Sequence, residues 1–188
     1  MKAFVISAFV VGLAVGVYAQ GFVYLDNFSN DNTNPLATAN GLFWLSTGGT
    51  PALINQDFNA AFYGGATSNN LSLIKTFLLS DGIHDNPFPG IFLDPTGNSY
   101  PVSGATTLAF FQVQAWTGNF NSYAAAVAAG APAAQSLIFL NPVSQPPGSP
   151  LPLFGMPAMV LSGIPEPSTF ALGALGGLCA WLLCRWRA

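Results

Sequence analysis

Charged side chains are scarce in this chain. They make up 6% of the 188 residues, against roughly 25% in an ordinary soluble protein. Between Gln20 and Ile164 the sequence has no arginine and no glutamate, and six aspartates against one lysine give a net charge of −5 with the histidine neutral. Such a surface cannot neutralise phosphate groups, so we expect no nucleic-acid partner, and anionic lipid headgroups are disfavoured for the same reason.

Cysteine is missing from the same region, since Cys179 and Cys184 both lie near the C-terminus. This absence excludes a disulfide, a catalytic thiol and a cysteine-based zinc site between residues 20 and 162. No glycine-rich phosphate loop opens a helix after a strand, so we expect no nucleotide and no other cofactor. The length suits one domain with a sizeable core.

The N-terminal residues have the pattern of a secretory signal peptide. Met1 and Lys2 supply a positive start, residues 3–16 are apolar, and Val17-Tyr18-Ala19 places small residues at the positions that signal peptidase reads. We therefore expect residues 1–19 to be removed between Ala19 and Gln20. An uncleaved anchor helix is the alternative.

Residues 20–162 are predicted to form an exported all-β domain, because short β-rich runs alternate with turns rich in Gly, Pro, Asn and Asp. We expect an antiparallel sandwich or a jelly-roll-like fold. The predicted strands are 21–25, 41–45, 60–63, 71–79, 90–93, 106–116, 136–140 and 158–161.

Three local patterns add detail to this prediction. Gln112 and Gln114 alternate with apolar residues in the strand 106–116, which is typical of a half-buried strand. Lys75 shares its face of strand 71–79 with apolar residues, so we expect it at an edge or a strand end. Residues 121–130 favour a short helix capped by Ser122 and ended by Gly130.

The segment 141–152 is rich in proline and favours an extended conformation. It is either a loop inside the domain or a stalk that follows it. We favour the loop, because residues 158–161 again have the composition of a strand.

His84 is the only histidine, and it lies between Asp81 and Asp85. A hydrolase would need a serine nucleophile beside it, but the sequence contains no G-x-S-x-G motif. Polar turns contain the same residue types, so we interpret His84 as a solvated turn residue and predict no catalytic residues.

Two loops collect oxygen ligands of the kind that calcium prefers, one at residues 30–34 and one that begins at Asp94. Neither matches an EF-hand loop with its distal glutamate. Turns stabilised by Asn and Asp side chains explain both loops without a metal, and we predict no metal site.

Four aromatic residues, Trp44, Tyr63, Trp116 and Tyr123, could form a platform on which sugar rings stack. Tryptophan at strand positions is also a common core residue. Glycan stacking on Trp44 and Trp116 is therefore one of two interpretations, and burial in the core is the other.

The C-terminal segment 163–188 has three parts in a fixed order. A Pro165-Glu166-Pro167-Ser168 motif comes first, and an apolar stretch over 169–184 follows it. This stretch is just long enough to cross a thin bilayer as a helix. The basic end 185–188 carries Arg185 and Arg187, which mark the cytoplasmic side and stop transfer.

This order of motif, apolar helix and arginines closely resembles the PEP-CTERM sorting signal of exopolysaccharide-producing Gram-negative bacteria. The resemblance implies that an exosortase, a membrane-embedded cysteine transpeptidase or protease, recognises Pro165, Glu166 and Pro167. It also implies that the chain is held in the inner membrane during sorting and is then delivered to the cell surface or the extracellular space.

We therefore expect a non-enzymatic exported protein with a structural or adhesive role at the cell surface or in the extracellular matrix. A carbohydrate-binding module acting within the exopolysaccharide matrix is the alternative. A hydrolase that uses His84 is a third possibility.

Overall fold

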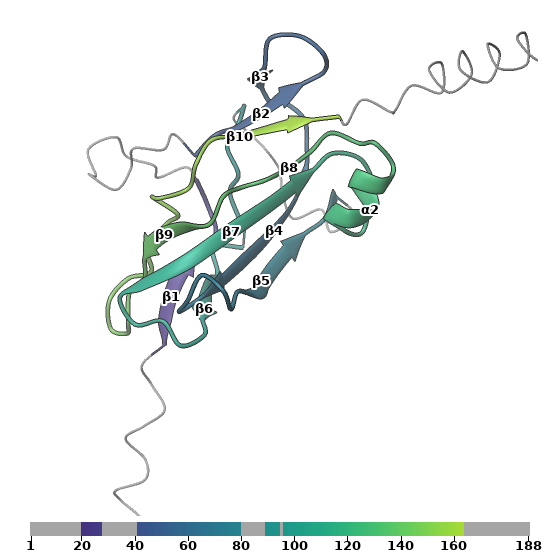
Figure 1. The fold of residues 1–188 in the computed structure, drawn as a ribbon. Helices are drawn as coiled ribbons and strands as arrows, with labels where there is room; N and C mark the ends of the chain where they lie inside the picture. The colour runs from purple at the N-terminus through teal and green to yellow at the C-terminus, as the bar shows by residue number, and fades with distance from the viewer. Residues whose placement is uncertain (1–19, 28–40, 80–88, 95, 164–188) are drawn as a thin grey trace, which may run out of the picture.

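The computed structural model describes residues 20–27, 41–79, 89–94 and 96–163, and this part of the chain is all-β. Figure 1 shows long strands crossing the domain, with one short helix at the side of the sheet. The elements are β1 (Gly21–Tyr24), β2 (Phe43–Ser46), β3 (Ala52–Leu53), β4 (Asn59–Gly65), β5 (Ser72–Phe77), β6 (Ser99–Val102), β7 (Leu108–Trp116), α2 (Tyr123–Ala128), β8 (Ala133–Gln135), β9 (Phe139–Pro142) and β10 (Met159–Ser162).

Eight of these strands form one large sheet in the order β3-β2-β10-β8-β7-β4-β5, with β9 paired to the free half of β7. All its pairings are antiparallel except that of β10 with β2, which is parallel from Met159↔Phe43 to Ser162↔Ser46. The sheet is therefore mixed, whereas the sequence predicted a wholly antiparallel one. A parallel pair needs a long connection between its strands, and here the chain between β2 and β10 builds most of the domain.

The remaining strands, β1 and β6, pair with each other as a small antiparallel sheet. The proline-rich segment runs beside β1, because Phe22 forms a bridge with Ser144 and Val23 forms one with Leu151. The segment 141–152 is thus a loop that completes the sheet around β1, as we expected, and the chain returns from it to β10.

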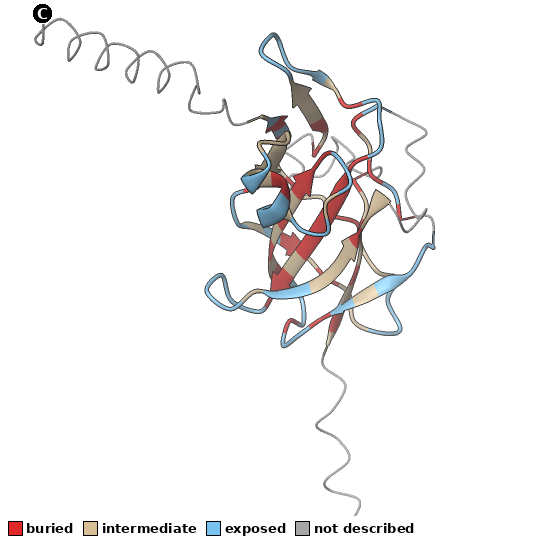
Figure 2. Cartoon of the chain, turned by 90° about the vertical axis from the view of Figure 1, so that its right-hand side faces the viewer, coloured by how far each residue is buried: buried red, intermediate tan, exposed pale blue. Residues whose placement is uncertain are grey.

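The core fills the space between the small sheet and one face of the large sheet. We call this the inner face; on β7 it carries Ala109, Phe111, Val113 and Ala115, which are fully buried. The opposite, outer face carries Leu108, Phe110, Gln112 and Gln114. Figure 2 shows buried residues along the middle of the long strands and exposed residues on the loops.

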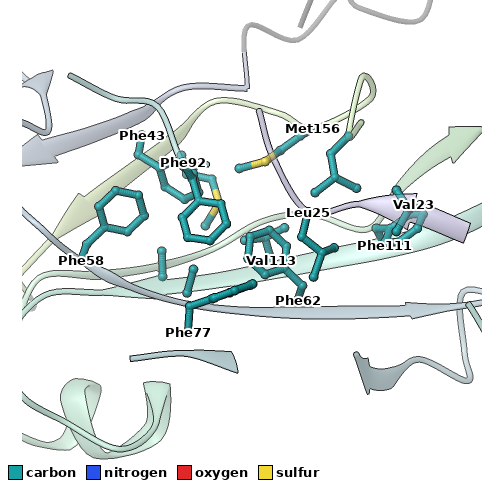
Figure 3. Packing of buried hydrophobic residues seen from close by; sticks show 14 of the residues in the cluster. Val23, Leu25, Phe43, Phe58, Phe62, Phe77, Phe92, Phe111, Val113 and Met156 are labelled. Carbon is teal, nitrogen blue, oxygen red and sulfur yellow. The ribbon is translucent and has the colours of Figure 1, made fainter. Parts of the chain in front are cut away.

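Aromatic rings make up the centre of this core, and Phe92 joins them (Figure 3). Its ring centroid lies 4.9 Å from that of Phe77, 5.1 Å from that of Phe62 and 6.2 Å from that of Phe58. Tilted and edge-to-face contacts of this kind add to the free energy gained from burial. The segment that carries Phe92 is therefore fixed by side-chain packing rather than by a strand ladder.

Three buried asparagines, Asn27, Asn59 and Asn141, bond the backbone at points where the ladders end. Asn27 donates to the carbonyl oxygens of Gly41 and Gly90, at 2.6 and 3.1 Å, and its Oδ1 accepts from Phe92 N at 2.6 Å. Asn141 donates to Pro152 O and accepts from Gly155 N, both at 2.9 Å. These side-chain amides supply hydrogen bonds to backbone groups at places where strand pairing stops.

The predicted strands are largely confirmed, since β1, β2, β4, β5, β7 and β10 overlap six of the eight. The prediction of a strand at 90–93 is wrong, because the structure has none there. Gly90 has a φ of 75°, which is a left-handed conformation and not a strand one. Its N–H and C=O bond to Ile54 O and Phe43 N, so this segment crosses the end of β2 as a turn.

The strand predicted at 136–140 is only partly right. β9 begins at Phe139, and Ser136 interrupts pairing because its hydroxyl accepts from Val113 N at 2.9 Å. The sequence pattern did not predict β3, β6 and β8, and β6 follows directly on the predicted loop that begins at Asp94. These strands have two to four residues, too few to show a period.

Replacing Asn27 by alanine should lower the free energy of unfolding by about 2–4 kcal/mol, because Gly41 O and Phe92 N lose a buried hydrogen bond, while Gly90 O keeps its bond from Phe43 N. Urea unfolding of the purified protein, followed by tryptophan fluorescence, measures this change. The matched control is Asn69→Ala in the exposed turn between β4 and β5, which should change stability by less than about 0.5 kcal/mol. Equal effects of the two variants would contradict the role given to Asn27.

Candidate functional site

A groove of about 390 Å³ lies on the outer face of the large sheet, beside α2. This volume falls within the range of about 300–1,000 Å³ that small-ligand sites occupy. Its walls come from three neighbouring strands and from the start of α2, and consist of Ala61, Tyr63, Leu73, Thr76, Gln114, Trp116, Asn121, Ser122, Tyr123 and Ala124.

Strand alternation explains why these side chains meet. In β7, Gln114 and Trp116 point to the outer face because their neighbours point into the core. Ala61 of β4 pairs with Gln114 on one side and with Thr76 of β5 on the other, so all three share the outer face.

A bulge in β5 adds Leu73 to the groove. Phe62 pairs with Lys75 and Tyr63 pairs with Leu73, so Ile74 is an extra residue without a partner in β4. Beyond such a bulge the facing of the side chains changes. Leu73 therefore leaves the face of Lys75 and stands opposite Tyr63, with 54% of its surface exposed.

Lys75 lies on β5, the edge strand of the sheet, as predicted. Its Nζ is 5.7 Å from the centroid of the Phe77 ring, close enough for a favourable contact between cation and ring. Because Lys75 pairs with the buried Phe62, its side chain is directed to the inner side of the sheet and away from the groove.

The helix α2 is confirmed where the sequence predicted a helix. Ser122 is its N-cap, and its hydroxyl accepts from Ala125 N at 3.2 Å. At the other end Gly130 has a φ of 72°, and the bonds of Gly130 N to Val127 O and of Ala131 N to Ala126 O close a Schellman motif. The helix lies against β7 and β8 (Figure 1), where its buried Ala126 packs with Trp116.

Trp116 forms the floor of the groove. Its Nε1 donates to Phe120 O at 2.9 Å, and its ring meets that of Tyr123 edge-on at a centroid distance of 6.5 Å. Asn59 fixes the backbone on either side of Thr117 by donating to Trp116 O and Gly118 O. Only 1% of Trp116 is exposed, whereas Tyr63 and Tyr123 are half-buried and border the open space.

The structure thus brings together three of the four aromatic residues that the sequence singled out. Trp44 is not among them. It is half-buried on β2, and the strands β10 and β8 lie between β2 and β7. Trp116 is a buried residue of the small cluster under α2.

The polar lining of the groove was not predicted. Thr76, Gln114, Asn121 and Ser122 present hydroxyl and amide groups, which both donate and accept hydrogen bonds. Among the described residues that line the groove, none carries a carboxylate or an ammonium group. The arrangement is therefore suited to stacking and neutral hydrogen bonding. Strand parity could have placed Gln114 beside Trp116, but nothing in the sequence reveals the bulge at Ile74.

The loop that begins at Asp94 lines part of a second cavity, which has a volume of about 320 Å³. The Asp94 carboxylate accepts from Thr96 N and Oγ1 at 2.8 and 2.6 Å, and from the hydroxyl of Tyr100 at 2.8 Å. This is the side-chain-stabilised turn that we offered as the alternative to calcium. In the described ranges, no three His, Cys, Asp or Glu side chains gather as a metal site would require.

The other predicted sites lie outside the described residues. They are His84 with Asp81 and Asp85, the loop 30–34, Ala19 of the cleavage site, the motif Pro165-Glu166-Pro167-Ser168, and Arg185 and Arg187. Gln20, the other cleavage-site residue, is half-buried just before β1. Over the part of the chain that the structure describes, no helix is both long and apolar enough for a membrane crossing. The predicted helix 169–184 lies outside this part of the chain.

Comparison with known proteins adds no relative: no family model, curated protein or solved structure matches the chain.

Burial raises the pKa of Tyr100, and its hydrogen bond to Asp94 raises it further. Below the ordinary tyrosine pKa of about 10, both folded and unfolded states keep the proton. As the pH rises above that value the unfolded state ionises first, so stability should fall until the folded-state pKa is passed. Tyr100→Phe should weaken this alkaline loss, although it should cost about 1 kcal/mol at neutral pH.

The measurement is urea unfolding of both proteins at neutral pH and at several values above about pH 10. A difference in stability between the two proteins that shrinks with rising pH supports this role of Tyr100. Parallel curves over the whole range contradict it.

Proposed function

We propose that this chain is an exported, non-enzymatic protein that carries a PEP-CTERM sorting signal and has a structural or adhesive role at the cell surface or in the extracellular matrix. The observation that carries the proposal is the order of the segment 163–188: Pro165-Glu166-Pro167, an apolar stretch, then Arg185 and Arg187. The signal-peptide pattern over residues 1–19 supports the same route of export.

The chemistry of the motif suits recognition by an exosortase. Prolines on both sides of Glu166 disfavour a helix that would continue from the apolar stretch, which keeps the motif extended, as a protease cleft requires. Glu166 is the only glutamate in the chain and lies outside the apolar stretch, where its charge stays hydrated. In this proposal the apolar residues 169–184 hold the motif at the inner membrane until it is processed.

The outer face of the sheet supports an associative role for the domain. Leu108 and Leu140 lie on it and are 51% and 46% exposed, and Leu137, between β8 and β9, is 84% exposed. Exposed apolar groups with few charges around them favour contact with another surface over free solubility. We further propose that the two sheets make up a sandwich-like fold, with the small sheet packed over the inner face of the large one.

A second candidate, a carbohydrate-binding module within the exopolysaccharide matrix, is favoured by the groove beside α2. The aromatic and amide side chains that line it are the types that bind sugar rings and sugar hydroxyls. The two candidates are compatible, because adhesion to a matrix needs a surface that binds one of its components.

Ending the chain after Ile164 should release the domain from the membrane, because the apolar stretch and the arginines that hold it are removed. A matched variant keeps the full length but replaces Pro165, Glu166 and Pro167 by alanine. It should accumulate in the inner membrane with its tail uncut.

Cell fractionation locates each variant, and intact mass gives its C-terminus, in hosts with and without the exosortase. Retention of the truncated chain in the membrane fraction would contradict the sorting role of the tail. Normal processing of the alanine variant would contradict the role of the motif.

A further inference from the structure

The groove beside α2 combines two kinds of surface that a sugar ring needs. The half-buried rings of Tyr63 and Tyr123 border it and the buried Trp116 closes its floor. The apolar C–H face of a pyranose packs well against such rings. Leu73, brought to this face by the bulge at Ile74, extends the apolar part of the wall.

Polar groups line the same groove and can bond the hydroxyls of a stacked sugar. Thr76 and Gln114 supply them from the strands, and Asn121 supplies an amide from the start of α2. The Gln114 amide already donates to Gln135 Oε1 at 3.0 Å, which holds its side chain along the sheet surface. A hydroxyl can both donate to and accept from these groups, whereas a purely apolar ligand would leave them unpaired.

The charge distribution selects among sugars. Lys75 is the only lysine or arginine among the described residues, and it is directed to the opposite side of the sheet. A uronic acid or a sulfated sugar would lose its hydration in the groove without gaining a cation. The net negative charge of residues 20–164 would repel it further.

We propose that the groove formed by Tyr63, Trp116, Tyr123, Gln114 and Thr76 is a binding site for an uncharged glycan chain. One sugar ring stacks on the exposed parts of the tyrosine rings, and its hydroxyls bond to the amide and hydroxyl groups that line the groove. This inference rests on the adhesive role proposed above and gives that role a site and a class of ligand. The site recognises the apolar faces of the sugar rings and the absence of charge on the glycan.

Ala124 permits a test that leaves the fold intact. It lines the groove from the first turn of α2 and is exposed, and its neighbour Ala125 is equally exposed but does not line the groove. Leucine is a strong helix former, so both Ala124→Leu and Ala125→Leu should preserve α2. Only the leucine at position 124 projects into the space that the sugar would occupy.

The experiment uses the protein purified from the envelope of the producing cells. Calorimetric titration is done with hexasaccharides of β-1,4-glucose, β-1,3-glucose and β-1,4-mannose, and with hexagalacturonate as the anionic counterpart. At least one neutral chain should bind with a Kd below about 1 mM and at least tenfold more tightly than hexagalacturonate. Ala124→Leu should weaken that binding about tenfold or more, and Ala125→Leu by less than about twofold.

Two further variants test the stacking. Tyr63→Ala should abolish the binding, whereas Tyr24→Ala, in the second cavity, should leave it unchanged. Circular dichroism and melting curves establish that each variant is folded. If Tyr63→Ala unfolds, the Ala124→Leu and Ala125→Leu pair decides the question alone.

Several outcomes would overturn the inference: no binding of any neutral chain, equal or tighter binding of the anionic chain, or equal effects of leucine at positions 124 and 125. Binding is measured on purified protein, so its failure is distinct from a failure of sorting, which is read from location and mass in the cell. If the unaltered protein binds a neutral glycan but its tail is not processed by the exosortase, this site stands and the proposed route is removed.

Discussion

Hydrogen bonds from three buried asparagine side chains hold the ends of this fold together. Asn27, Asn59 and Asn141 are at most 2% exposed, and each joins backbone groups from separate segments. A side-chain amide donates and accepts at once, so it replaces a piece of ladder where no strand is at hand. In a domain without cysteine, these amides fix the connections that a disulfide would fix in many exported proteins.

The groove depends on the same device. Asn59 accepts from Leu79 N at 2.7 Å and donates to the carbonyls on both sides of Thr117, so it ties the end of β5 to the end of β7. The Trp116 side chain then bonds to Phe120 O and sets the chain on its path into α2. The ring of Tyr123 takes its place as a consequence. The hydrogen bonds of Asn59 and of the Trp116 side chain to the backbone thus position Trp116 and the start of α2.

Much of this arrangement could be predicted from residue patterns, and the rest could not for physical reasons. Alternation predicted β7 because a strand of nine residues shows its period clearly, and the Ser122 cap and Gly130 predicted α2. The bulge at Ile74, the turn at Gly90 and the break at Ser136 depend on partners far along the chain. The separation of Trp44 from the other three aromatics could not be predicted for the same reason. It lies on β2, and no local pattern specifies which strands come between β2 and β7.

The last described strand, β10, has consequences for how the domain bears force. It lies inside the large sheet, paired with β2 over four residues on one side and with β8 at Ser162↔Ala133 on the other. Tension applied from the C-terminal direction therefore acts on an interior strand. An edge strand has one neighbour to separate from, but β10 has to break its parallel ladder with β2 and its antiparallel pairing with β8.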